Sequence, residues 1–596
     1  MTTSFIHPAL ILIFGALLLP FIKEPFRKLY LCTVPLLTFF LVLYLNWHPG
    51  VYGVVLFMEK WTLTFGRVDN LSMIFAFIMA LMAIIGTVYG LHVKDNNQHI
   101  AAWFYVAGSL GVIYSGDYLV LFLFWELMAF ASTFLIWLNT DKDALAAGYR
   151  YLLVHTFGGV LLLLGFVLRY QATGDLSFVQ LDEQNSQLFT WLIMAGLMLN
   201  AAVPPLHSWL PDAYSKATVT GAVFMCAFTT KTAVYTLARA FAGFDILIVL
   251  GVVMAIYGIV YALLENDIRK LLGWEIISQV GYMVAGVGIG TALAINGTCA
   301  HAFAHILYKG LLFMAAGAII HSTGKCKFTE LGGLYNKMPN TLFFMLVGGI
   351  SVSAFPFFSG FVSKSMIISA SFESHLLLVG FLLTLVSIGT FLVAGLRLPY
   401  LIFFGEDRCS AETREMAADP PWNMHMAMAA AAFFCLLVGT YLPFLYTMLP
   451  YQEVSYHPYG SYHLSETLQI LAFTGLAFVF LKDKLGAKAT ISLDLDWFYR
   501  KAGRAFLWLA QNPIQWVDTA WGAAYRVVGL YSLMVTARFW SWFDWHGIDG
   551  VVDGSARCVQ AFGRRITIVL QKGHIQQTIY YSVTFVAILL ISYVCL

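Results

Sequence analysis

Long apolar segments recur along almost the whole chain, and they restrict what it can fold into. A helix needs about 20 apolar residues to cross the hydrocarbon layer of a bilayer. Only 11% of the 596 residues are charged, whereas soluble domains carry about 25% charged residues. The composition therefore predicts an all-α polytopic membrane protein with about sixteen transmembrane helices. These spans are expected to start near Phe5, Leu29, Asn70, Ala101, Asp117, Ala147, Leu188, Thr218, Phe244, Lys270, Gly297, Asn340, His375, Met424, Leu464 and Gln577.

Lysine and arginine gather in alternate loops between these spans. The opposite loops hold little beyond Lys60 and Arg67. Cytoplasmic loops carry the excess of basic residues in multi-pass proteins. We therefore predict an inner (cytoplasmic) membrane protein with both termini outside. The basic loops, predicted to be cytoplasmic, hold Lys23, Arg27, Lys28, Lys94, Lys142, Lys216, Arg269, Lys270, Lys325, Lys327, Lys337, Arg408 and Arg414.

Six ionisable side chains lie inside predicted spans. A charge at bilayer depth costs at least ~2.5–3.5 kcal/mol, so such residues indicate function. A mixture of acid, base and imidazole spread over several helices is typical of a proton path. The alternative for the lysines, Lys364 above all, is a helix-end side chain that extends to the interface. The predicted path consists of Glu126, Lys231, His301, His305, Lys309 and Lys364.

Three of these residues, His301, His305 and Lys309, are spaced four apart on one predicted helix. They therefore share a face, along which histidine and a desolvated lysine can pass protons through bridging water. The two histidines could instead bind a metal, but no carboxylate or thiolate on the same face of this helix completes such a site. Secondary candidates are His155, Glu275 and Asp212, together with Arg150. His155, Glu275 and Arg150 lie nearer helix ends, where a solvated or paired role is expected.

Two predicted spans are interrupted by proline, at 202–209 (AVPPLHSW) and 354–361 (AFPFFSGF). Interrupted helices in corresponding halves of a transporter indicate inverted repeats with the ion path at the breaks. The alternative is a pair of ordinary proline kinks.

The connection between residues 483 and 576 combines basic residues with frequent tryptophan. This composition favours an amphipathic helix that lies in the membrane interface, while a folded cytoplasmic domain is the alternative. Pro513 is predicted to divide the segment, and Gly547, Gly550 and Gly554 are predicted to end it.

No catalytic, cofactor or metal motif is recognisable. The eight cysteines form no CxxC pair, and there is no GxGxxG, P-loop or HExxH sequence. We therefore expect no disulfide framework, no bound metal and no cofactor of the chain's own. The net charge of +2 gives no reason to expect nucleic acid as a partner.

Five motifs in order carry a resemblance to a known family. They are FWELM around Glu126, PLHSWLPDA at 205–213, DIRKLLGWEIISQVGYM at 267–283, HAFAHILYKGLLFMAAG at 301–317 and FSGFVSK at 358–364. Residues 95–405 thereby resemble the antiporter-like membrane subunits of respiratory complex I, Mrp-type cation/proton antiporters (most closely their D-type component) and membrane-bound hydrogenases. The tail, with HGIDGVVDG at 546–554, resembles the end of complex I's most distal pump subunit, which has a lateral helix and a final span.

The resemblance implies a core of two inverted five-helix bundles with broken helices. The implied division is N-terminal transmembrane helices (1–95), a first antiporter repeat (96–240), a second repeat (241–405), additional transmembrane helices (406–482), an amphipathic lateral segment on the cytoplasmic side (483–576) and a terminal transmembrane helix (577–596).

The resemblance also implies residue roles. In the family, the glutamate at the Glu126 position tunes a lysine on the first broken helix. Nine residues before Trp209, where that lysine is expected, this chain has Asn200, which cannot take up and release a proton. The first half-channel is therefore altered or silent, or Lys231 takes the role. Lys231, His301, His305, Lys309 and Lys364 match family positions.

The expected function is proton translocation, with Na+/H+ exchange as one form of it, by a subunit embedded in the lipid bilayer among other membrane subunits of a larger complex. That complex is either driven by electron transfer or is a secondary antiporter, and a third relative couples such a subunit to inorganic-carbon uptake. Other classes left open are a structural brace and an enzyme acting on quinone, although no redox group is recognisable.

Overall fold

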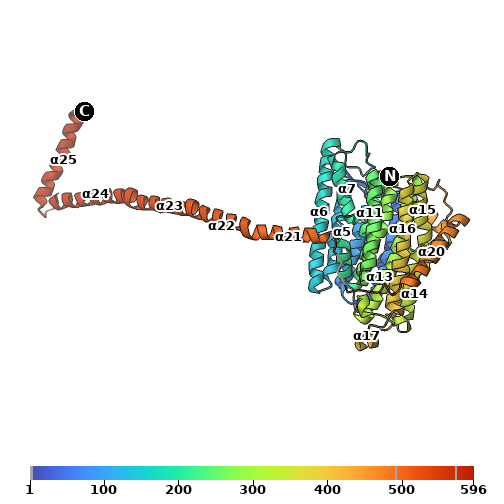
Figure 1. Cartoon of the computed structure of the whole chain (residues 1–596). Coiled ribbons are helices and arrows are strands. Elements are labelled where there is room, and N and C mark those ends of the chain that lie inside the picture. The colour runs from blue at the N-terminus through green and yellow to red at the C-terminus, as the bar shows by residue number, and fades with distance from the viewer. Residues whose placement is uncertain (1–4, 490–492, 571–572, 596) are drawn as a thin grey trace. The chain divides into compact units, whose positions relative to one another are not determined.

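The computed structural model describes residues 5–489, 493–570 and 573–595. The chain divides into a helical unit that ends at Leu495 and a second unit that begins at Asp496 (Figure 1). The main helices of the first unit are α1 (Pro8–Leu18), α2 (Glu24–Asn46), α3 (Asn70–Tyr89), α4 (Asn96–Tyr114), α5 (Tyr118–Trp137), α6 (Lys142–Thr173), α7 (Leu188–Asn200), α8 (Trp209–Lys216), α9 (Val219–Ala227), α10 (Thr229–Ala240), α11 (Asp245–Leu264), α12 (Ile268–Ile289), α13 (Ala292–Thr323), α14 (Pro339–Val352), α15 (Ser359–Glu373), α16 (Leu377–Thr390), α17 (Ala411–Met416), α18 (Trp422–Thr440), α19 (Leu442–Tyr446) and α20 (Ser461–Leu481).

The chain is a multi-pass integral membrane protein. Among the described residues, 11 helices are long and apolar enough to cross a membrane, and three shorter apolar helices accompany them. Each predicted start of a span lies within five residues of the first residue of a helix. The all-α polytopic class is therefore confirmed, with one exception among the described residues.

That exception is a two-stranded antiparallel hairpin, which was not predicted from the sequence. Its strands are β1 (Gly50–Phe57) and β2 (Trp61–Val68), with Gly50 opposite Val68. The runs VYGVVLF and WTLTFGRV are rich in β-branched and aromatic residues, which is the signal for a hairpin. Asp69 follows β2, and Arg239 at the end of α10 donates two hydrogen bonds of 2.7 Å to it. Burial raises the pKa of Asp69, but these bonds, the charges of Arg239 and Arg67 and the Ser72 amide together outweigh it and hold the pKa at about 2.

Both predicted breaks exist, and they share one backbone feature. The first separates α7 from α8, and the second separates α14 from α15. Two residues beyond the end of each first half-helix, an alanine adopts a left-handed conformation: φ is 60° at Ala202 and 57° at Ala354. Such backbone costs roughly 1–3 kcal/mol and clusters at functional sites.

Two consecutive helices, α5 and α6, recur 150 residues later as α12 and α13. Asp117 and Asp267 cap the N-termini of α5 and α12, and each accepts two backbone amides. The helices that follow, α6 and α13, each have 32 residues and end at a left-handed glycine, Gly174 or Gly324. This spacing supports the predicted pair of repeats and gives equivalent positions in the two halves.

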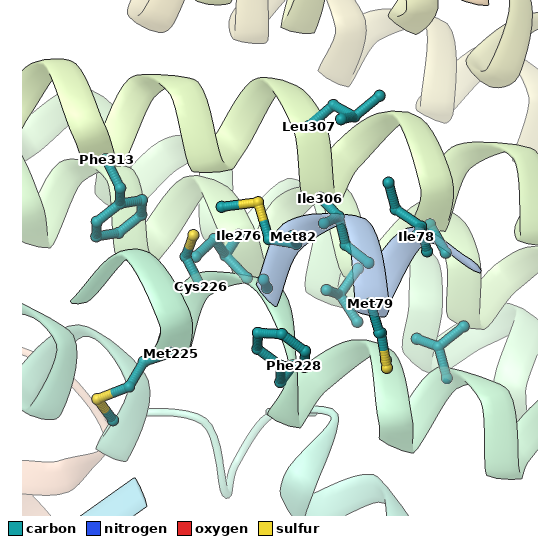
Figure 2. Packing of buried hydrophobic residues seen from close by; sticks show 14 of the residues in the cluster. Ile78, Met79, Met82, Met225, Cys226, Phe228, Ile276, Ile306, Leu307 and Phe313 are labelled. Carbon is teal, nitrogen blue, oxygen red and sulfur yellow. The ribbon is translucent and has the colours of Figure 1, made fainter. Parts of the chain in front are cut away.

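Among the helices long enough to cross a membrane, α12 and α13 are the most buried: 94% of the most apolar stretch of each is covered by other parts of the chain. Figure 2 shows part of the surrounding core, where Met79 and Met82 of α3, Cys226 of α9 and Ile306 of α13 meet. Charges on α12 and α13 are therefore surrounded by protein rather than by lipid.

The second unit has a continuous helical segment, Asp496–Leu570, and a final helix, α25 (Ile575–Cys595). The segment comprises α21 (Asp496–Leu509), α22 (Gln515–Ala524), α23 (Ser532–Phe543) and α24 (Asp549–Leu570), joined by wider π-helical turns. Of the predicted 483–576 connection, residues 490–492 and 571–572 lie outside the described residues.

The predicted interruptions of this segment are wrong. Pro513 lies in the wider turn Ala510–Ile514, where the helix continues despite the missing amide. Gly547 lies in a similar turn, and Gly550 and Gly554 lie within α24. A glycine in a helix interior is only about 1 kcal/mol less favourable than an alanine, so neighbouring residues with high helix propensity can keep the segment helical.

Candidate functional site

A buried ion pair lies at the centre of the second predicted repeat. The ammonium of Lys309 on α13 donates to Glu275 Oε2 on α12, and both side chains are fully buried. Glu275 was expected nearer a helix end in a solvated or paired role; it is paired, but it is the eighth residue of α12 and lies fully buried inside the bundle. Pairing offsets the desolvation cost that either charge would incur alone.

The two histidines lie one and two turns before Lys309 on α13. His301 Nδ1 is 3.0 Å from Ser363 Oγ on α15, and the Tyr308 hydroxyl is 3.5 Å from His301 Nε2. His305 has no hydrogen-bond partner among the described residues, and its ring centroid is 6.2 Å from that of His301. The order along one face is therefore Lys309, His305, His301.

Lys364 follows Ser363, the residue that contacts His301. It exposes 1% of its surface, and its Nζ donates to the Val352 carbonyl at 2.7 Å. That carbonyl ends α14, where the helix dipole is negative and favours a cation. The same ammonium lies 5.4 Å from the centroid of the Tyr282 ring. These contacts hold the side chain inside the protein, in contrast to the alternative that it extends to the interface.

Lys231 has a similar environment at another interrupted helix. Its Nζ donates to the Cys226 carbonyl in the last turn of α9 at 2.7 Å and to Thr230 Oγ1 at 3.0 Å. Lys231 lies near enough to His305 for the two groups to interact electrostatically. Both buried lysines thus bind carbonyls at the ends of interrupted helices.

The first repeat lacks the equivalent ion pair. With the offset of 150, His155 corresponds to His305 and Gly159 to Lys309. A side-chain carbon at Gly159 would overlap Glu126 Oε1, so the carboxylate faces the position where the second repeat has an ammonium. Glu126 Oε1 has no hydrogen-bond partner among the described residues. The first repeat therefore has a glycine in place of the base, and its acid, Glu126, is one residue beyond Trp125, which corresponds to Glu275.

Asn200 is the last residue of α7 and is fully buried. Its amide lies beside His155, but no atom of either side chain meets hydrogen-bond geometry with another described residue. His155 was expected nearer a helix end in a solvated or paired role, yet it exposes only 1% of its surface. Asp212, by contrast, forms a half-exposed pair with Arg150, whose Nη2 is 2.7 Å from Asp212 Oδ2.

A second cluster, which was not predicted from the sequence, lies at the first break. His207, fully buried, has Nε2 3.2 Å from Asp494 Oδ1, and the Tyr257 hydroxyl donates to the same oxygen at 2.6 Å. Tyr261 donates to the Leu493 carbonyl at 2.7 Å. The residues that precede the long helix of the second unit are thereby fixed to the broken helix. Nothing in the spacing of these residues signals the contact, because Asp494 is about 290 positions from His207.

Replacing Asp494 with asparagine is expected to weaken this attachment. The amide keeps an oxygen for Tyr257 but loses the charge opposite His207, and hydrogen bonds to charged groups contribute about 1.5–3 kcal/mol. The expected result is a lower thermal unfolding midpoint of the assembled complex. The control is Asp518→Asn, at an exposed aspartate of α22. An unchanged midpoint for Asp494→Asn would show that the contact contributes nothing.

No group of three or more histidine, cysteine or acidic side chains suited to a metal occurs in the described part of the chain. The two α13 histidines have hydroxyl and lysine neighbours instead. The site is a line of ionisable side chains buried within the bundle.

Known proteins share the region that holds this line of groups. The family model for the transmembrane region of NADH:quinone oxidoreductase and Mrp antiporters matches residues 115–392. This segment is similar to the transmembrane region that the family shares. The matched segment includes both breaks and every charged residue of the predicted path, so the resemblance seen in the motifs is confirmed.

Two curated relatives are components of a Na+/H+ antiporter of Alkalihalophilus pseudofirmus. Its A component is 32% identical over 402 residues, which are 60% of this chain and 50% of that protein. Its D component is 29% identical over 384 residues, which are 60% of this chain and 78% of that protein. The chain thus spans half the length of the A component.

A solved structure extends the similarity to the whole chain. One component of the membrane-bound sulfane sulfur reductase, an archaeal respiratory membrane complex, matches with a TM-score of 0.68 and 24% identity. The match covers 98% of this chain and 99% of that one. At this identity it establishes a shared fold.

Proposed function

We propose that this chain is a proton-translocating subunit of a multisubunit membrane complex and that it exchanges protons for Na+. The observation that carries the proposal is the line of buried groups on α10, α13 and α15. Lys231, His305, His301 and Lys364 each expose at most 1% of their surface, and Lys309 is paired with Glu275. Keeping so many ionisable groups out of water is costly, and proton relays are the usual reason for it.

The proposed switch is the pair Glu275–Lys309. Unit charges 4 Å apart interact by ~4 kcal/mol at an effective dielectric constant of ~20, which corresponds to about three pKa units. If Glu275 takes up a proton, Lys309 loses its countercharge and releases its own proton toward His305. The proton then passes to His301 and, through the Ser363 hydroxyl, to Lys364. This scheme uses no residue of the first repeat, so Asn200, His155 and Glu126 have a secondary role in it.

The proposed environment is the inner (cytoplasmic) membrane, with the basic loops inside and both termini outside. The partners are other membrane subunits. The long helix of the second unit supports this, because none of its described residues is buried by the chain and it presents large apolar side chains along its length. A bracing role for that helix is compatible with ion transport by residues 96–405.

The Na+ exchange is tested in inside-out vesicles that contain the assembled complex and a pH-sensitive dye, after respiration has acidified the interior. Addition of NaCl is expected to return protons to the outside, while choline chloride has no effect. If Na+ and choline act alike, Na+ is not the exchanged ion. Identification of the co-purifying subunits by mass spectrometry separates the two settings: iron–sulfur or hydrogenase subunits indicate a redox-driven pump, and only small hydrophobic and antiporter-like subunits indicate a secondary antiporter.

A further inference from the structure

A cavity of about 420 Å³ lies between α15, α16 and α20, beside Lys364 (Figure 1 shows these three helices). It is large enough for several water molecules, since a water occupies about 30 Å³ in the liquid. Lys364 lines it from the buried side. Its remaining polar lining residues are Ser365 and Ser369 of α15, Thr384 of α16, Ser387 of α16, and His463, Glu466 and Thr467 of α20, with Ser353 at the second break and the exposed Tyr462.

Polar lining residues of the cavity lie on α15 and on α16. Ser365 and Ser369 lie one turn apart on the same face of α15, and the Tyr456 hydroxyl is 3.2 Å from Ser369 Oγ. Thr384 and Ser387 face them from α16 across the cavity. Ser365 and Thr384 donate to carbonyls of their own helices, and their hydroxyl oxygens can still accept hydrogen bonds from water.

The lining residues of α20 include an acid and an imidazole. His463 Nδ1 is 3.9 Å from Glu466 Oε2, and 29% and 44% of these side chains are exposed, respectively. His463 Nε2 has no hydrogen-bond partner among the described residues. The cavity therefore joins a fully buried ammonium to a partly exposed carboxylate on α20, outside the segment that the family model matches.

We propose that this cavity is a water-filled proton passage between Lys364 and the surface beside the first turns of α20. Glu466 is the acceptor at its mouth, and His463 positions it. A proton leaves the Lys364 ammonium, which becomes a neutral amine, crosses the water chain and binds the Glu466 carboxylate. The resulting carboxylic acid then releases it to bulk water. The proposal rests on the proposed function and adds α20 to it.

Water in the passage is tested by cysteine labelling of the assembled complex in sealed vesicles. Ser369→Cys and Thr384→Cys are treated with a membrane-impermeant trimethylammonium thiosulfonate, and the modified peptides are identified by mass spectrometry. Ser371→Cys is the matched control, because Ser371 is buried on the same helix and does not line the cavity. Both cavity positions are expected to react at least about tenfold faster than position 371, since only a thiolate in contact with water reacts. Equal, slow reaction at all three positions would mean that lipid or protein fills the cavity, and would overturn the proposal.

The role of Glu466 is tested by proton flux in the same complex. Glu466→Gln is expected to slow flux at least about tenfold, because positioned proton donors and acceptors contribute factors of that order or more. Glu466→Asp should retain most of it, as should Gln469→Ala at an exposed position one turn away. If Lys364→Met stops flux and Glu466→Gln does not, the passage is wrong and the proposed function stands. If neither change affects flux, the proposed function fails as well.

Discussion

Replacing Lys309 with methionine is expected to destabilise the folded chain by about 3–5 kcal/mol, because it leaves the Glu275 carboxylate buried without a countercharge. Both side chains are fully buried, and Lys309 is the cation paired with Glu275. The measurement is the thermal unfolding midpoint of the purified complex, together with the yield of assembled protein.

The matched variant for this prediction is the double substitution Glu275→Gln with Lys309→Met. It removes both charges, and replacing a whole buried pair is often close to neutral. The double variant should therefore regain most of the stability while remaining inactive in transport. If Lys309→Met alone is as stable as the parent, the two groups do not form a charged pair in the folded protein.

Glu275→Gln is expected to reduce proton flux at least about a hundredfold, while Glu126→Gln retains most of it. The interaction that Glu275→Gln removes is worth ~4 kcal/mol at an effective dielectric constant of ~20, and a change of about 1.4 kcal/mol alters an equilibrium tenfold. Glu126 faces Gly159 rather than an ammonium, so the same substitution there removes no ion pair.

Proton flux is measured with both variants in sealed vesicles that contain equal amounts of assembled complex. The opposite result would contradict the proposed switch: loss of proton flux in Glu126→Gln and retained flux in Glu275→Gln. That outcome would place the controlling acid in the first repeat despite Asn200.

The sequence predicts much of this architecture because its main constraints are local. Apolar length places the helices, and the charges inside them are enough to identify α13 and Lys364. The hairpin was missed because the segment around Lys60 and Arg67 was treated only as a loop between two spans. Pro513 was read as an interruption because a helix that widens by one residue per turn leaves no mark in the composition.

The site itself depends on contacts that are distant in sequence. Glu275 is 34 positions from Lys309, and only the packing of α12 against α13 makes them partners. The same holds for His207 and Asp494, which lie on segments with no shared pattern. The correspondence of Gly159 with Lys309 also emerged only when the helix ends defined the offset between the repeats.

The most direct test of proton transfer along α13 is proton flux through the assembled complex with His305→Gln, the residue midway along the buried line. Glutamine is similar in size and polarity but cannot carry a proton between neighbours at neutral pH. The control is His321→Gln on the same helix, where the side chain is exposed. We predict that flux is lost in the first variant and kept in the second. Unchanged flux in His305→Gln would show that protons do not pass along α13.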